Sequence, residues 1–158
     1  MALIILCFCL IAVFIQDWKY RRIHIVLPLL IFSLSIILIS LKSIVLIKII
    51  ILNIVFFLIT LSILMIYMSV KSKKFLNPFQ HYFGLGDLLF YVAISPLFLV
   101  KNYILFFILS LLFAILMQFG LKKIIKEKTV PLAGFASLFL FIILLKDNFL
   151  LFQKITLM

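Results

Sequence analysis

The chain has 158 residues, 68% of them hydrophobic, and its 15 Lys and Arg against four acids give a formal net charge of +11. Soluble domains carry about 45–50% apolar residues, so this composition and the mean hydropathy of +1.48 exclude a water-soluble globular domain. The cations occur in short clusters between apolar runs, as in membrane-protein loops, and we therefore expect a lipid bilayer and no nucleic acid as partner.

Six apolar segments follow one another along the chain, at 2–16, 23–41, 44–70, 86–100, 102–120 and 130–145. A transmembrane helix takes about 20 residues. We therefore predict an all-α, polytopic membrane protein with about six transmembrane helices, forming a single integral-membrane domain over residues 1–158. The first segment has its cations after it rather than before it, which predicts a retained span and not a signal peptide. The boundary between the second and third segments, at 41–48, stays open.

The distribution of cations between the segments predicts the orientation. The first, third and fifth connections contain ten of the fifteen Lys and Arg: Lys19, Arg21, Arg22, Lys71, Lys73, Lys74, Lys122, Lys123, Lys126 and Lys128. Cations collect on the cytoplasmic side of membrane proteins. We therefore expect these connections in the cytoplasm, both termini outside it, and the protein in the cell inner (cytoplasmic) membrane.

Two of the four acids then lie at the same membrane face. Asp17 ends the first segment, which exits into the cytoplasm, and Asp87 begins the fourth, which enters from it. Two carboxylates brought close together cannot both ionise cheaply, so the pair would share a proton and present an acid and a base together. Aspartic proteolysis needs this combination.

The stretch "GLGD" (84–87) places Gly84 and Gly86 just before Asp87. Glycine permits a close approach of the backbone, which suits a site that receives an extended peptide. A structural interpretation competes with this one. Asp87 is also a residue type that caps helices, and Asp17 could simply offset the cations of "KYRR". Taken singly, each acid favours the structural interpretation, and their common face favours the chemical one.

No metal or cofactor is expected. His24 and His81 share the predicted face of the acids, but the chain lacks a spacing such as H-E-x-x-H. Cys7 and Cys9 lie inside the first segment and form no zinc-ligand pattern. Asp147 falls at the opposite face and is expected to be structural, while Glu127 is expected to pair with neighbouring lysines.

Three segments together resemble the type IV prepilin peptidases, including the preflagellin peptidases, which are membrane aspartic proteases of the GxGD kind. "DWKYRRIHIVLPLL" (17–30) is similar to the family's first catalytic segment, an Asp followed by cations and then R-I-P-N; Arg22 and Ile23 match. "GLGDLLF" (84–90) matches the G-x-G-D element. "VPLAGFASLFL" (130–140) is similar to the I-P-F-G-P-x-L-A segment, through Pro131 and Ala136.

The resemblance implies an intramembrane aspartic endopeptidase with Asp17 and Asp87 as catalytic residues, and with Gly84, Gly86 and Arg22 binding substrate or supporting the motifs. Its substrate would be a pilin-like precursor, cut at the cytoplasmic face after a glycine and before the pilin's hydrophobic helix. Larger relatives also methylate the new N-terminus through a domain with four cysteines; nothing similar is found here, so no methyltransferase activity is expected.

The chain departs from the family pattern at three places. His24-Ile25 replaces P-N, Leu89 replaces a lysine, and Leu132-Ala133-Gly134 stands where F-G-P is usual. A non-catalytic membrane assembly factor or transporter subunit on the same scaffold is the alternative function. The sequence leaves open which precursor is cut and the oligomeric state.

Overall fold

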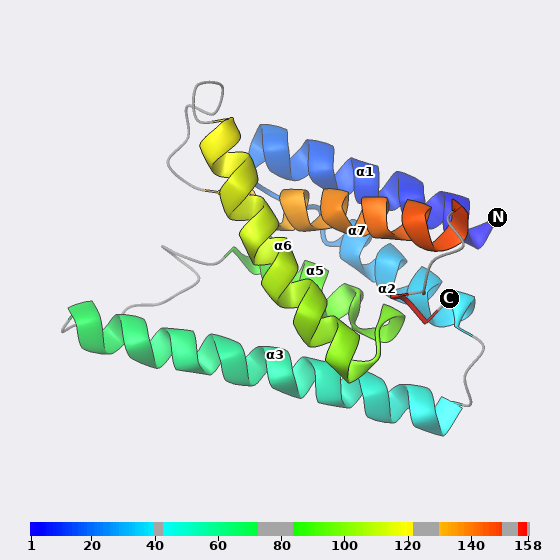
Figure 1. Ribbon diagram of the computed structural model, residues 1–158, viewed down its shortest axis with the longest axis horizontal. Coiled ribbons are helices and arrows are strands. Elements are labelled where there is room, and N and C mark those ends of the chain that lie inside the picture. Colours follow the sequence, from blue (N-terminus) through cyan, green and yellow to red (C-terminus); the bar gives the residue numbers. More distant parts are fainter. Residues whose placement is uncertain (40–42, 73–83, 122–129, 150–154, 158) are drawn as a thin grey trace.

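The computed structural model describes residues 1–39, 43–72, 84–121, 130–149 and 155–157, and all regular structure in these ranges is helical (Figure 1). The elements are α1 (Ala2–Tyr20), α2 (Val26–Leu38), α3 (Ser43–Ser72), α5 (Leu85–Ala93), the 3₁₀ turn η1 (Ser95–Leu97), α6 (Val100–Gly120) and α7 (Leu132–Phe149). Each predicted apolar segment contains one α-helix, so the all-α prediction is confirmed. At the open boundary, α2 ends at Leu38 and α3 begins at Ser43, while residues 41 and 42 lie outside the described ranges.

The fourth segment differs most from its prediction. From the sequence, one span over 86–100 with a kink at Pro96 is expected, but α5 ends at Ala93 and a short 3₁₀ turn follows. Pro96 lies in that turn and has no N–H to continue a helical hydrogen-bond ladder. Phe98 and Leu99 are extended, and α6 begins afresh at Val100. The segment is thus a short helix and a bend.

Helix length distinguishes three of the elements. Among the described residues, α1, the 44–71 part of α3 and α6 are long and apolar enough to cross a membrane, whereas α2 and the stretch Leu85–Leu97 are apolar but shorter. Large apolar side chains face outward on the long helices, for example Phe8 at 68% exposure and Ile63 at 62%. This arrangement suits a lipid environment. Six complete crossings remain a prediction.

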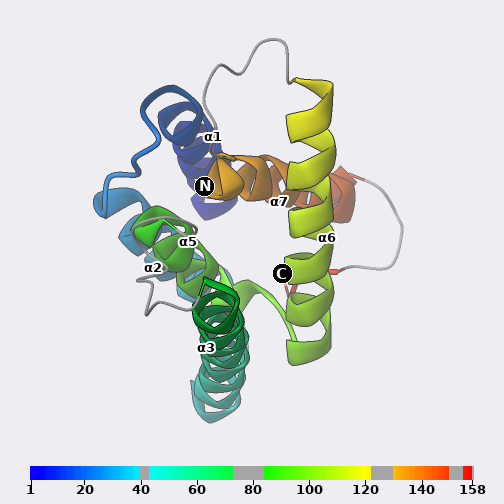
Figure 2. The same ribbon diagram turned by 90° about the vertical axis from the view of Figure 1, so that its left-hand side faces the viewer.

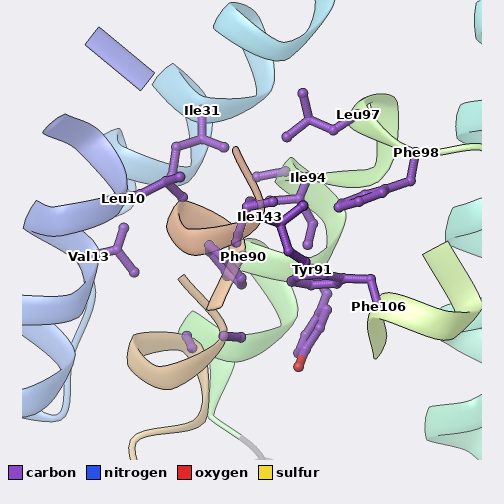
Figure 3. Close-up of a cluster of buried hydrophobic side chains, with 14 of the residues drawn as sticks. Leu10, Val13, Ile31, Phe90, Tyr91, Ile94, Leu97, Phe98, Phe106 and Ile143 are labelled. Atoms are coloured by element: carbon purple, nitrogen blue, oxygen red, sulfur yellow. The ribbon is translucent and has the colours of Figure 1, made fainter. Parts of the chain in front are cut away.

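The core lies where α1, α2, α5 and α7 meet. α1 packs against α7 and α2, α5 packs against α2 and α7, and α3 contacts η1 and α6. Figure 3 shows apolar side chains from these elements converging on one cluster, which includes Leu10, Val13, Ile31, Phe90 and Ile143. Figure 2 shows α3 on one side of the molecule, away from α1 and α7. The helices that carry Asp17 and Asp87 therefore both contribute to the buried core.

The two ends of the molecule differ in what they contain. In Figure 1, the N and C labels both lie on the right, at the end away from the start of α7. The C-terminal end of α1 and the first residues of α5 and α7 lie on the left. One end of the molecule thus gathers Asp17 and Asp87, and the other gathers the termini.

Candidate active site

Asp17 lies in the last turn of α1. The predicted segment ended at residue 16, but the helix continues to Tyr20 and ends where Arg21 adopts a left-handed backbone, with φ 53°. The N–H of Arg21 donates to the carbonyl oxygen of Asp17 at 3.1 Å. The Asp17 side chain is buried, at 7% exposure. Trp18 packs edge-on against Phe135 of α7, with ring centroids 5.7 Å apart, and holds this end of α1 to α7.

Asp87 lies in the first turn of α5. Gly84, in an extended conformation, is the residue that precedes the helix, and its N–H donates to Oδ2 of Asp87 at 3.0 Å. This contact is the capping interaction that the structural interpretation of "GLGD" anticipated, although Asp87 occupies the third helical position and not the cap itself. It uses only one carboxylate oxygen. The other oxygen points to a different helix.

The start of α7 brings the two carboxylates together. The N–H of Ala133 donates to Oδ1 of Asp87 at 2.7 Å, and the N–H of Gly134 donates to Oδ2 of Asp17 at 2.7 Å. The first N–H groups of a helix have no partner inside it, and Pro131, which precedes α7, has no side-chain acceptor to offer. Carboxylates from α1 and α5 therefore complete the first turn of α7.

This arrangement limits how far apart the acids lie. Adjacent amide nitrogens in a helix are about 3 Å apart. With a 2.7 Å hydrogen bond on each side, the bonded carboxylate oxygens of Asp17 and Asp87 are separated by at most about 8 Å. The charge of Asp17 also acts on Asp87. Residues seventy positions apart thus meet at the start of one helix, on two adjacent amides of α7.

Two glycines permit this close packing. A Cβ atom on Gly134 would lie 3.1 Å from Oδ2 and 3.2 Å from Cβ of Asp17, and one on Gly86 would lie 3.1 Å from Cδ1 of Ile23. Both distances are shorter than ordinary van der Waals contacts between side chains. Gly86 therefore lets α5 approach the connection after α1, and Gly134 lets α7 approach Asp17.

Arg21 is the cation that lies at the two acids. Its charge acts on both Asp17 and Asp87, although the described residues contain no ion pair between them within 4.0 Å. Its side chain is half-buried, and its Nε and Nη1 atoms are enclosed with no hydrogen-bond partner. Sequence reasoning missed this residue because it is one of three cations in "KYRR" and only Arg22 matches a family position.

Arg22 is placed differently from its neighbour. It is exposed and lines an open hollow of about 570 Å³ together with Gln16, Tyr20 and Ile23. His24 lines the same hollow, and its backbone N–H donates to the Gln16 side chain at 3.1 Å. The role that the resemblance implies for Arg22 stays a prediction.

Clusters of possible metal ligands can be described only for the residues that the structure covers. Within the described ranges, no three His, Cys, Asp or Glu side chains come together as a metal site would require. His81 and Glu127 lie outside these ranges.

Three comparisons with known proteins were made. A family model described as the type IV leader peptidase family matches residues 4–119, which include both Asp17 and Asp87. No curated protein and no solved structure matches the chain. The matched region ends before α7, so the amide contacts of Ala133 and Gly134 are observations of this structure alone.

Proposed function

The chain belongs to the type IV leader peptidase family, and from this premise we propose that it is an aspartic endopeptidase whose catalytic residues are Asp17 and Asp87. Its substrate is a pilin-like precursor, from which it removes the short leader peptide. The observation that carries the proposal is that the two carboxylates accept hydrogen bonds from the adjacent amides of Ala133 and Gly134. No other two acids among the described residues share such a contact.

The reaction requires one ionised and one protonated carboxyl group. The ionised carboxylate takes a proton from a water molecule, whose oxygen attacks the carbonyl carbon of the scissile peptide bond. The protonated carboxyl hydrogen-bonds the carbonyl oxygen as negative charge develops on it. The resulting diol collapses when the peptide nitrogen receives a proton and the C–N bond breaks. Both acids end the cycle sharing one proton again.

The start of α7 supports this division of roles. Backbone N–H groups and the positive end of a helix stabilise a carboxylate, while repulsion between neighbouring carboxylates opposes full ionisation of the pair. One negative charge on the pair is therefore stabilised and a second is disfavoured. Because both contacts come from one rigid helical turn, they also fix the relative position of the acids.

The orientation of the site follows from the cations. Lys19, Arg21, Arg22 and Lys71 all lie at or just beyond the helix ends nearest the two acids, and this distribution favours a cytoplasmic site. Cleavage would then take place at the cytoplasmic face, with both termini on the other side. In this arrangement each of the long helices, α1, α3 and α6, makes one crossing. The remaining crossings are made by α2, by α5 with η1, and by α7.

Substitution of each acid tests the proposal. Purified protein should cut a precursor with a basic leader, and Asp17→Asn and Asp87→Asn should each reduce the rate by roughly a thousandfold or more, since each removes a group that exchanges protons. Asp147→Asn is the matched control, because Asp147 lies at the far end of α7. It should retain cleavage per folded molecule.

The opposite result is equally clear. A rate near that of the unsubstituted protein for either Asp17→Asn or Asp87→Asn would rule out the proposed pair. Assembly of a pilus or transport complex that is unaffected by both substitutions would instead support the alternative, a non-catalytic membrane component.

A further inference from the structure

Arg21 combines two features that are each unfavourable. Its backbone is left-handed, with φ 53°, the only positive φ of a non-glycine residue in the described part of the chain. Its guanidinium is partly enclosed, and Nε and Nη1 have no hydrogen-bond partner there. A side chain with a Cβ resists the left-handed region, and enclosed polar groups without partners destabilise a fold. Both features point to a role that folding alone does not explain.

The backbone conformation determines where the guanidinium lies. The N–H of Arg21 closes the last turn of α1 on the carbonyl oxygen of Asp17, at 3.1 Å. The chain then turns toward α2, so the Arg21 side chain stays at the helix end that carries Asp17. Arg22, one residue later, is exposed. The turn therefore separates two adjacent arginines, one at the acids and one at the surface.

The carboxylates do not satisfy the free donors. No ion pair joins Arg21 to Asp17 or Asp87 within 4.0 Å in the described ranges, and Asp87 accepts from Gly84 and Ala133 instead. Nε carries one N–H and Nη1 carries two. Donors thus lie unused beside a pair of acids that act on a peptide bond.

A peptide substrate supplies the missing acceptors. An extended chain presents a carbonyl oxygen at every residue, and each one that leaves water for the site needs a donor. The amides at the start of α7 are already used by Asp17 and Asp87. Arg21 is the group at the acids with donors to spare.

We propose that Arg21 is a substrate-binding residue, whose enclosed N–H groups hold a backbone carbonyl oxygen of the precursor beside Asp17 and Asp87. This inference rests on the proposed function and deepens it, because it names the group that positions the peptide. It assigns Arg21 a contact with substrate and no proton transfer.

Binding of a precursor peptide tests this inference without cleavage. The protein, carrying Asp87→Asn to prevent turnover, is placed in lipid nanodiscs. A fluorescent peptide with a lysine-rich leader ending in glycine and an apolar segment is then titrated, and empty nanodiscs correct for partition into lipid. Adding Arg21→Met should weaken binding about tenfold to a hundredfold, the range for a hydrogen bond from a charged donor. Arg21→Lys should restore part of the affinity.

Two further variants separate binding from folding. Arg21→Asn removes the guanidinium but suits a left-handed backbone, so it should bind as weakly as Arg21→Met while unfolding at the temperature of the parent protein. Lys19→Met removes an exposed cation two residues away, whose Nζ lies over the Tyr20 ring. It should change the affinity little, which would exclude a general effect of charge.

The outcomes for the two proposals are distinguishable. Unchanged peptide affinity in both Arg21→Asn and Arg21→Met would overturn the inference. If the same variants also displaced the pH profile of cleavage, Arg21 would act through the carboxylates and not through the substrate. Arg21-dependent binding without cleavage by the unsubstituted protein would overturn the proposed function and support the inference. Failure of the parent protein to bind the peptide would contradict both.

Discussion

The two ends of α7 hold carboxylates in contrasting ways. Near its C-terminal end, Oδ2 of Asp147 accepts hydrogen bonds from the N–H of Ile155 at 3.0 Å and from the N–H and hydroxyl of Thr156, both at 2.8 Å. Lys146 lies 3.5 Å from Oδ1. At the other end, Asp17 and Asp87 each accept one N–H from adjacent residues of α7. The carboxylate of Asp147 thus contacts three hydrogen-bond donors and a lysine. The carboxylates of Asp17 and Asp87 are instead held at neighbouring amides of one helix turn.

The difference separates an acid with a structural role from the two acids of the proposed catalytic pair. Burial tends to raise the pKa of Asp147, which lies beyond the apolar stretch 130–145, but the hydrogen bonds of Thr156 and Ile155 and the charge of Lys146 outweigh it, and the pKa lies below its ordinary value. Asp147 is thus held ionised and anchors the segment at 155–157, as its expected structural role requires. On the proposed function, the pair at the start of α7 instead retains one proton for the reaction.

Among the substitutions that leave both acids in place, closing the space between α7 and Asp17 should have the largest effect. A Cβ at position 134 would lie 3.1 Å from Oδ2 of Asp17, so Gly134→Ala must displace the carboxylate or the helix. Small misplacements of catalytic groups are costly, and we expect cleavage to fall about tenfold to a hundredfold. Initial rates on a precursor peptide measure this.

Gly120→Ala is the control for that substitution. No atom lies within 4 Å of a Cβ at position 120, at the end of α6, so the rate should be unchanged. Equal rates for Gly134→Ala and the unsubstituted protein would mean that Asp17 does not need its contact with α7.

Asp147→Asn should affect stability and not catalysis. Because the folded pKa of Asp147 lies below its ordinary value, its stabilisation is fully present above the ordinary pKa and is lost as pH falls through the folded value. We expect a loss of about 1–3 kcal/mol near neutral pH. The difference in melting temperature between the two proteins should shrink below about pH 4. A difference that persists unchanged at lower pH would mean that ionisation of Asp147 does not matter.

The smallest effect is expected at Gly86. A Cβ there would lie 3.1 Å from Cδ1 and 3.2 Å from Cγ1 of Ile23. Since these are side-chain atoms that can move, Gly86→Ala should lower the cleavage rate only severalfold. Adding Ile23→Ala, which removes both atoms, should restore much of the rate. Failure of that rescue would place the effect of Gly86 in the backbone of α5 rather than in its contact with Ile23.

Much of the fold could be predicted from the sequence because membrane helices follow hydropathy. The six apolar segments each contain a helix, and the positions of Asp17 and Asp87 in that order place both acids at one end of the molecule. The ends of helices were harder to predict. Asp17 belongs to α1 because the helix continues through polar residues past its apolar part. Pro96 lies in a 3₁₀ turn after the end of α5, where only a kink was expected.

The inner contacts of the site could not be predicted for a physical reason. Hydropathy gives depth in the membrane but not the rotation of a helix about its axis. Nothing in "KYRR" indicates that Arg21 is half-buried with enclosed donors while Arg22 is exposed. Likewise, "VPLAGF" does not reveal that its amides bind carboxylates from α1 and α5. Pro131 after the last basic connection was the available signal, since proline favours the start of a helix and has no side-chain acceptor to cap it.

The first turn of α7 is capped by carboxylates from two other helices, and this has a consequence for biosynthesis. Residues 133 and 134 are translated after both acids, so a nascent chain that has inserted only its earlier helices has nothing to hold its carboxylates side by side. On the proposed function, hydrolytic competence arrives only when α7 docks against α1 and α5.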